Sequence, residues 1–401
     1  MSTVNGLDGS SAPTFLGYRR PNGRVGVRNH LLVLSASIYA NATCQRIANS
    51  LRGAVAVTHP LGRCQVSSDL RRTYDTLVGT AVNPNVGAVL VIDHFREEGC
   101  TAEEIAEAVH AEAGVPAIHL NERFDGGVIG VTAKGTRAGL DLLRQLTAQP
   151  REEASMDELL LGLNCGTSDT TSGISVNPAL GHASDRVVAA GGRAVLAEIT
   201  ELMGAEPWLA EKAVSEEVAQ KVWDVCRDME EQVLLTGTDL RGSQPTGDNI
   251  LGGLTTVEEK SLGGAKKSGS APIQDVIDWA ARPGKDPGVY LMYTPGHGGE
   301  SITGIAAGGS QLLVFTTGGG HSIAHPVMPT IKATANPSSW EAMKDTVDLD
   351  LTGILRGEMT LEEGGQAILD EILAVASGKR TKCELLYEDT DFAINRVGIS
   401  T

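Results

Sequence analysis

The chain has 401 residues, more than one ordinary hydrophobic core accommodates, so two domains are expected. Its composition is globular, with 41% hydrophobic and 21% charged residues. The net charge of −17 argues against nucleic acid or an anionic membrane as a partner, because both bind to basic protein faces. A local group of arginines can still bind a small anionic substrate.

Cysteine spacing and hydropathy argue against several further classes of protein. None of the six cysteines forms a CxxC pair, which argues against a structural zinc site or a regular iron–sulfur cluster. We find no run of about 18 apolar residues and no basic segment followed by an apolar leader. We therefore expect a cytoplasmic protein that does not enter a membrane.

The first part of the chain predicts an α/β domain. Residues 1–16 are polar and predict a disordered tail. Strands are then expected over residues 30–34, 54–60, 88–92 and 116–120, with helices over 41–51, from a cap among Ser67, Ser68 and Asp69, over 102–113 and over 133–147. Strands that alternate with helices are typical of βαβ units in a parallel sheet. This domain is expected to span residues 17–148.

Residues 149–153, QPREE, indicate the boundary to a second, catalytic α/β domain over residues 155–401. Its expected strands are 159–163, 194–198, 289–293 and 312–315, and its expected helices are 211–235, 273–279 and 361–376. The predicted fold class is therefore α/β, with two βαβ domains and largely parallel sheets. In such sheets ligands bind at the loops that follow the carboxyl ends of the strands.

Two of these strands end in residues that carry chemistry. Cys165, Ser168 and Asp169 follow the strand at 159–163, and Glu198 and Glu201 follow the next one. A thiol and several carboxylates at neighbouring strand ends predict a reaction centre. The alternative is that Ser168 and Asp169 only cap a helix, which would leave Cys165 and Glu198 unexplained.

Four glycine-rich loops share hydroxyl and charged residues, at 164–173, 252–264, 294–301 and 315–326. Their backbone N–H groups and hydroxyls suit carboxylate, sulfonate or phosphate oxygens. The residues that we expect to bind such oxygens are Ser168, Thr255, Thr256, Thr316, Thr317 and Gly318. No loop fits a P-loop or a GxGxxG motif that opens a βαβ unit, so nucleotide binding is the weaker interpretation.

Titratable residues in these loops are candidates for proton transfer. Glu259 and Lys260 are expected to abstract a proton and clamp a carboxylate, although a capping box of Thr256 with Glu259 is an alternative. His297 lies in a glycine-rich loop and is a third catalytic candidate.

A basic group in the first domain is expected to bind an anion. It comprises Arg24, Arg28, His59 and Arg63. The alternative is that its arginines are only solvated at the surface.

Five blocks of sequence resemble, in order, the altronate/galactarate dehydratase family. They are GYRRPNGRVGVRN, GLNCGTSDTTSGISVNPALG, AEITELMGAE, GDNILGGLTTVEEKSLGG and LLVFTTGGGHSIAHPVMPTIKATANP. The resemblance extends from Gly17 to about Thr360. Full-length members carry a small N-terminal SAF-type domain, whereas this chain begins with the GYRRPNGRVGVRN block. QPTGDNILGGLTT and DLDLTGILRGEMT resemble the sulfo-lyase branch, whose large subunit works with a separate small SAF-type subunit.

The resemblance implies β-elimination from a 2-hydroxy acid, with (2R)-3-sulfolactate converted to pyruvate and sulfite. The alternative within enzymes is dehydration of a sugar acid to a 2-keto-3-deoxy acid, and the alternative outside enzymes is an acid-sugar-binding regulatory protein. A divalent metal is expected, Fe²⁺ first and Mn²⁺ or Mg²⁺ as alternatives, with the ligands Cys165, Asp169, Glu198 and Glu201. A homo-oligomer of the large chain is also expected.

Overall fold

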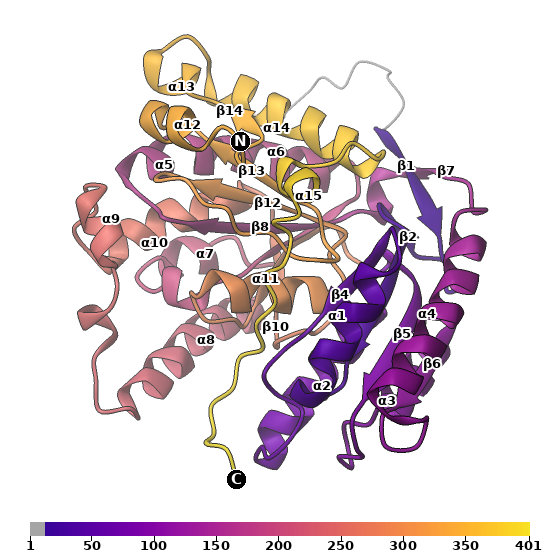
Figure 1. Ribbon diagram of the computed structural model, residues 1–401. Coiled ribbons are helices and arrows are strands. Elements are labelled where there is room, and N and C mark those ends of the chain that lie inside the picture. The colour runs from indigo at the N-terminus through magenta and orange to yellow at the C-terminus, as the bar shows by residue number, and fades with distance from the viewer. Residues whose placement is uncertain (1–12) are drawn as a thin grey trace.

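The structure is a computed structural model that describes residues 13–401. Its first half forms the right-hand side of Figure 1 around a four-stranded sheet in the order β4-β3-β5-β6. All neighbouring strands in this sheet are parallel, as the sequence predicts. The strands are β3 His30–Ser35, β4 Ala54–Val57, β5 Val86–Asp93 and β6 Ala117–Asn121, and the helices are α1 Asn41–Asn49, α2 Ser67–Ala81, α3 Ala102–Ala113 and α4 Gly127–Leu146.

The second half is built on a seven-stranded sheet in the order β10-β11-β9-β8-β12-β13-β14, which is also parallel throughout. The strands are β8 Leu160–Gly166, β9 Arg193–Leu196, β10 Ile273–Ile277, β11 Gly288–Met292, β12 Leu312–Thr317, β13 Thr330–Thr334 and β14 Leu349–Asp350. The longer helices are α6 Val176–Ala189, α8 Glu216–Leu234, α10 Val257–Ala265, α11 Gly298–Ala307 and α14 Leu361–Ala376. The shorter helices are α5 Thr170–Ile174, α7 Glu206–Ala210, α9 Gly247–Leu251, α12 Pro337–Met343, α13 Gly353–Arg356 and α15 Lys382–Leu386.

Both faces of the seven-stranded sheet are buried, which explains why its strands are almost continuously apolar. Leu161 and Leu163 of β8 face one hydrophobic core, shared with α6, α8 and α14. Leu160 faces a second core, shared with α11. Because side chains alternate along a strand, one apolar run supplies both layers. The strands then end at the rim where the polar residues of the sequence follow.

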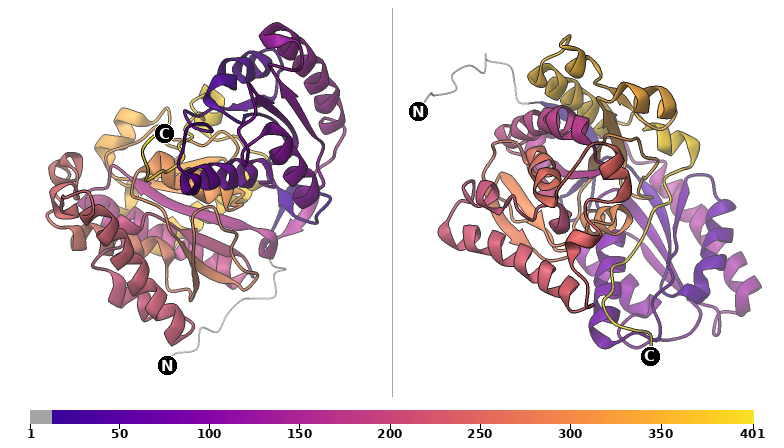
Figure 2. Two further views of the ribbon diagram at one scale, coloured as in Figure 1. Left: turned by 90° about the horizontal axis from the view of Figure 1, so that it is seen from below. Right: turned by 90° about the vertical axis from the view of Figure 1, so that its left-hand side faces the viewer.

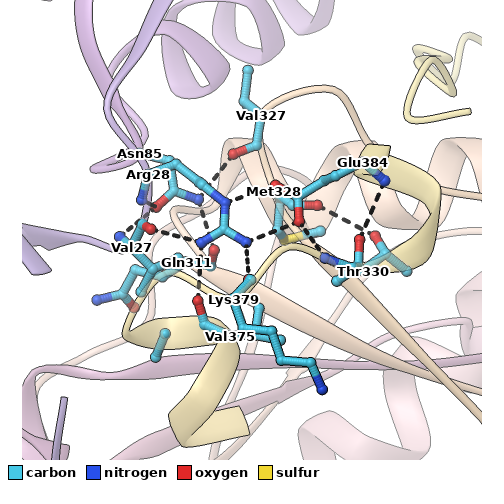
Figure 3. Close-up of polar contacts among 12 residues, drawn as sticks. Val27, Arg28, Asn85, Gln311, Val327, Met328, Thr330, Val375, Lys379 and Glu384 are labelled. Atoms are coloured by element: carbon cyan, nitrogen blue, oxygen red, sulfur yellow. Dashed lines mark hydrogen bonds and ion pairs between the residues drawn. The ribbon is translucent and has the colours of Figure 1, made fainter. Parts of the chain in front are cut away.

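Buried asparagines join the two halves of the molecule, which lie side by side in both views of Figure 2. The Asn83 side chain donates to the carbonyls of Ala306 and Ser310 at 2.8 and 2.9 Å. The Asn85 side chain donates to the carbonyls of Gln311 and Val327 at 2.6 and 2.9 Å (Figure 3). These bonds fix α11 and β12 against the first half.

Three sequence expectations differ from the structure. Residues 273–277 form edge strand β10 paired with β11, because tertiary pairing overrides the helical spacing of their apolar residues. No side chain caps α2, whose N-cap is Val66. Residues 14–16, assigned to a tail, begin β1 Thr14–Arg19, which pairs antiparallel with β7 Glu152–Ser155 and with β2 Val25–Gly26. The rest of the expected tail, residues 1–12, lies outside the described residues.

The position of the domain boundary stays a prediction. Within residues 13–401, no helix is long and apolar enough to cross a membrane.

Candidate active site

The candidate site lies where β8 and its parallel neighbour β9 end. β8 is central: the chain passes to β9 on one side and returns to β12 on the other. Such a change of direction in strand order leaves a ligand-binding crevice at the carboxyl ends of the strands. Cys165 lies near the end of β8, and Glu198 lies two residues after the end of β9.

Three predicted metal ligands meet at this rim. Donor atoms of Cys165, Glu198 and Glu201 all lie within 4.8 Å of one another. The Cys165 thiol donates to Glu201 Oε2 at 3.4 Å, and the Ser168 hydroxyl contacts the Cys165 sulfur at 3.6 Å. All four residues are buried. The two strand ends therefore form one cluster, and the role of its residues as metal ligands stays a prediction.

The backbone of Glu198 is held in an unusual conformation. Its φ of 71° lies in the left-handed region, which non-glycine residues seldom adopt. Two hydrogen bonds support it: the Glu198 amide donates to Thr294 Oγ1 at 2.8 Å, and the Cys165 amide donates to Glu198 Oε2 at 3.1 Å. The other carboxylate oxygen, Oε1, is buried and has no hydrogen-bond partner among residues 13–401. Such strain at a strand end is typical of functional sites.

A fully buried lysine, Lys267, completes the cluster and was missed in the sequence analysis. Its Nζ lies 2.7 Å from the Cys165 sulfur and 3.1 Å from Glu198 Oε2. The Lys267 and Glu198 side chains are each 1% exposed. The segment GGAKKSGSAP offers no local signal of this burial, because adjacent lysines are usually solvated.

Lys260, a predicted catalytic residue, lies on the other side of the cluster. Its Nζ is 2.7 Å from Glu201 Oε1, and both side chains are buried. Lys260 also donates to the side-chain oxygens of Gln244 and Asn249 at 2.7 and 2.9 Å. The Asn249 amide in turn donates to the Ser168 carbonyl at 2.9 Å. Lys260 therefore fixes Glu201 and connects α10 to the loop after β8.

Burial shifts the pKa values of the cluster. Desolvation raises the pKa of the Cys165 thiol to about 12, although the charge of Lys267 opposes this shift. Desolvation likewise raises the pKa of Glu198 to about 7, again against Lys267. For Lys267, burial would lower the pKa, but the nearby thiol and carboxylates outweigh it and raise the pKa. The site thus pairs two buried ammonium groups with two carboxylates and a thiol.

Asp169 acts as a helix cap in the structure. It is the N-cap of α5, and its Oδ1 accepts from the Ser172 amide at 2.7 Å in a capping box. Its Oδ2 accepts from the Asn336 side chain at 2.9 Å. The capping alternative is confirmed for Asp169, which does not belong to the cluster of possible metal donors. The Ser168 hydroxyl instead points to Cys165.

Other predicted residues of α10 lie at the surface. Thr256 caps α10 by accepting from the Glu259 amide at 3.2 Å. The Glu259 carboxylate accepts from the Thr255 amide and hydroxyl at 2.8 and 2.6 Å rather than from Thr256. All three are exposed, and their roles in catalysis and binding stay predictions.

The predicted residues of β12 are buried beside β8. Thr316 and Thr317 pair in register with Cys165 and Gly166, so β12 flanks β8 on the side opposite β9. The Thr316 hydroxyl donates to Asn177 Oδ1 at 2.5 Å, and Thr317 Oγ1 accepts from the Gly320 amide at 2.9 Å. The Thr316 hydroxyl thus connects β12 to α6 and the Thr317 hydroxyl supports the loop after β12, and their contact with a substrate stays a prediction.

The Gly318 backbone approaches Asp169 so closely that a Cβ there would lie 2.1 Å from the Asp169 Oδ1. His297 is exposed at the N-terminus of α11, with its Nδ1 3.7 Å from Glu300. The binding role predicted for Gly318 and the catalytic role predicted for His297 also stay predictions.

The four residues of the predicted anion pocket, Arg24, Arg28, His59 and Arg63, make their polar contacts away from the cluster at β8. Arg24 donates to the carbonyls of Val82 and Gly309, at 3.3 and 3.2 Å. Arg63 lies over the Phe95 ring and 3.5 Å from Glu97. None of these contacts involves the cluster at β8.

Arg28 and His59 are buried in the same half. Arg28 pairs with Glu384 at 2.7 Å (Figure 3). The His59 ring lies 2.8 Å from the Ser35 carbonyl through Nε2 and accepts from the Leu61 amide at Nδ1. The predicted anion pocket of Arg24, Arg28, His59 and Arg63 is therefore not supported by these contacts.

The fold and site together define an α/β protein with a buried thiol, carboxylate and lysine cluster at the carboxyl ends of two strands of a parallel sheet. Residues 156–400 match the C-terminal domain of D-galactarate/altronate dehydratase, and residues 17–149 match the second domain of D-galactarate dehydratase/altronate hydrolase. The chain belongs to this family, as its sequence blocks indicate.

Curated relatives agree with the family. The chain is 37% identical over 386 residues to (2R)-sulfolactate sulfo-lyase subunit beta of Chromohalobacter salexigens, covering 96% of this chain and 97% of that protein. It is 31% identical to altronate dehydratase of Escherichia coli and 30% identical to that of Bacillus subtilis, in each case over 96% of this chain and 78% of the relative. The names are those of lyases and dehydratases, so the chain is related throughout its length to elimination enzymes.

Proposed function

We propose that the chain catalyses β-elimination from a 2-hydroxy acid, with (2R)-3-sulfolactate as substrate and pyruvate and sulfite as products. The observation that carries the proposal is the buried cluster at the ends of β8 and β9. The 37% identity to the sulfo-lyase subunit favours sulfolactate over other hydroxy acids.

Elimination removes the proton at C2 as the bond from C3 to sulfur breaks, and sulfite leaves with the bonding electrons. The enol product then takes up a proton at C3 and becomes pyruvate. The C2 proton is only weakly acidic, so negative charge growing on the adjacent carboxylate must be stabilised. Lys260 and Lys267 place two ammonium groups at the cluster, where burial strengthens their electrostatic effect.

The donor set fits a divalent metal. Cys165, Glu198 and Glu201 offer a sulfur and two carboxylates within 4.8 Å, and Glu198 Oε1 is a buried oxygen without a hydrogen-bond partner among the described residues. A thiolate favours a transition metal over Mg²⁺, which supports Fe²⁺ as the ion. When bound, such a metal supplies Lewis-acid stabilisation of the growing negative charge.

We further propose that a small SAF-type subunit assembles with this chain. The designation of the relative as subunit beta supports a second subunit. The isolated chain would then bind metal but turn over substrate slowly or not at all until the small subunit is added.

The test is a product assay with the purified chain, Fe²⁺ and the small subunit. Sulfolactate should yield sulfite and pyruvate in equal amounts. Glu198→Gln should abolish turnover, whereas the exposed Glu258→Gln should retain it. Binding of the acid without turnover under every metal and subunit condition would support a regulatory protein instead.

The dehydratase relatives favour one second candidate, dehydration of a sugar acid. In that case altronate or galactarate would yield a 2-keto-3-deoxy acid, and sulfolactate would yield no sulfite. The same preparation distinguishes the two reactions.

A further inference from the structure

The ammonium group of Lys267 occupies the place where a metal would bind. Its Nζ contacts the Cys165 sulfur at 2.7 Å and Glu198 Oε2 at 3.1 Å, and both atoms belong to residues of the donor cluster. Metal ions approach thiolate at about 2.3 Å and carboxylate at about 2.1 Å. An ammonium and a metal cannot use the same lone pairs of these two donors together.

We propose that Lys267 is the resident cation of the donor cluster and that a divalent metal binds by displacing its ammonium from Cys165 and Glu198, while the Cys165 thiol releases its proton to the solvent. This inference rests on the metal assignment in the proposed function. Lys267 is then a positioning residue, because it holds the donors together before the metal arrives.

The pairing of charges supports this role. Glu201 is already paired with Lys260 at 2.7 Å, so Lys267 is the cation that compensates Glu198. A carboxylate that is 1% exposed is strongly destabilising without a partner. The cluster therefore needs either Lys267 or a metal to stay assembled. Glu198 Oε1, which Lys267 does not contact, is free for the first contact of an incoming ion.

Competition with an ammonium also selects the class of metal. Displacing Lys267 costs free energy, and an ion with high affinity for sulfur recovers it by binding Cys165. Mg²⁺ prefers oxygen ligands and retains its bound waters, so its binding to Cys165 would offset little of the free energy needed to displace Lys267. The site should therefore take up thiophilic ions such as Fe²⁺, Co²⁺ or Zn²⁺ and exclude Mg²⁺.

The test is a calorimetric titration of the purified full chain with Co²⁺ and, separately, Mg²⁺, without substrate. Lys267→Met, which removes the competing charge, should bind Co²⁺ at least about ten-fold more tightly than the unmodified chain and should gain measurable affinity for Mg²⁺. Lys332→Met is the matched control, because Lys332 is equally buried but donates to the Ile323 carbonyl. A thiolate-to-cobalt absorption band should appear with Lys267→Met and vanish when Cys165→Ser is added.

Equal or weaker Co²⁺ binding by Lys267→Met would overturn the inference, since a merely structural lysine would weaken binding when removed. Failure of both the unmodified chain and Lys267→Met to bind Co²⁺ would overturn the inference as well. If Lys267→Met does not fold, Lys267→Gln removes the same charge and carries the same expectation. Absence of elimination with every substrate, combined with the expected order of metal affinities, would refute the proposed function and leave this inference standing.

Discussion

Replacing Arg28 should lower the stability of the protein and leave KM for the substrate unchanged. Its guanidinium donates to both oxygens of Glu384 at 2.7 and 2.8 Å and to the carbonyls of Val27, Val375 and Lys379 at 2.8 to 2.9 Å. The two charged side chains are only 8% and 10% exposed. Removal of one member of a buried ion pair costs about 3–5 kcal/mol, because the other charge is left uncompensated.

The expected shift in melting temperature follows from chain length. At about 2.1 cal/mol/K per residue, the unfolding entropy of this chain is roughly 0.84 kcal/mol/K near its midpoint. A loss of about 3–5 kcal/mol therefore lowers the midpoint of Arg28→Met by about 4–6 °C. Differential scanning calorimetry measures this shift, and steady-state kinetics on the folded variant measure KM.

Glu384→Gln provides the second half of a double-mutant cycle with Arg28→Met. The double variant should lose clearly less stability than the sum of the two single variants, because the pair is lost only once. An unchanged midpoint in Arg28→Met together with a large rise in KM would refute this reasoning and restore Arg28 as a residue that binds the substrate.

Three further results are expected. Burial lowers the pKa of His59 to about 4 and of His325 to about 3, below the unfolded value of about 6.5, so the stability from their neutral rings is present above pH 6.5 and decreases as pH falls. Their joint share of the change between pH 7 and pH 5 is about 4 kcal/mol, so calorimetry should show that replacing both with Gln shifts the stability difference between these two pH values by about that amount in favour of pH 5. In alkylation with iodoacetamide followed by mass spectrometry, exposed Cys64 should react before buried Cys165, and early labelling of Cys165 would contradict its burial. Gly318→Ala should lower the melting midpoint by several degrees, because its Cβ would meet the carboxylate that caps α5 at 2.1 Å; an unchanged midpoint would contradict that close approach.

Much of the fold was predictable because the apolar strands are short and end abruptly in polar residues. The ends of the strands at β8 and β9 predict from sequence that Cys165, Glu198 and Glu201 lie at one rim, and their donor atoms lie within 4.8 Å of one another. The segment at 273–277 was misassigned because Ile273, Val276 and Ile277 fit a helical spacing as well as an edge strand. Only its pairing with β11 decides between the two.

The chemistry of the site was less predictable, because a single sequence does not reveal which charged residues are buried. Arg28 and Lys267 illustrate this. The sequence predicts a substrate contact for Arg28, which forms a buried ion pair with Glu384 in the structure. The sequence gives no sign of a role for Lys267, which lies in the buried cluster and pairs with Glu198. Asp169 shows the reverse case, in which a local capping signal in the sequence was the correct interpretation.

The four hydrogen bonds that the side-chain amides of Asn83 and Asn85 donate limit how this protein can move during turnover. A hinge between the halves would have to break all of them at once inside a buried joint, leaving several polar groups without partners. We therefore expect substrate entry and product release to depend on smaller movements, in the loops that follow β8, β9 and β12.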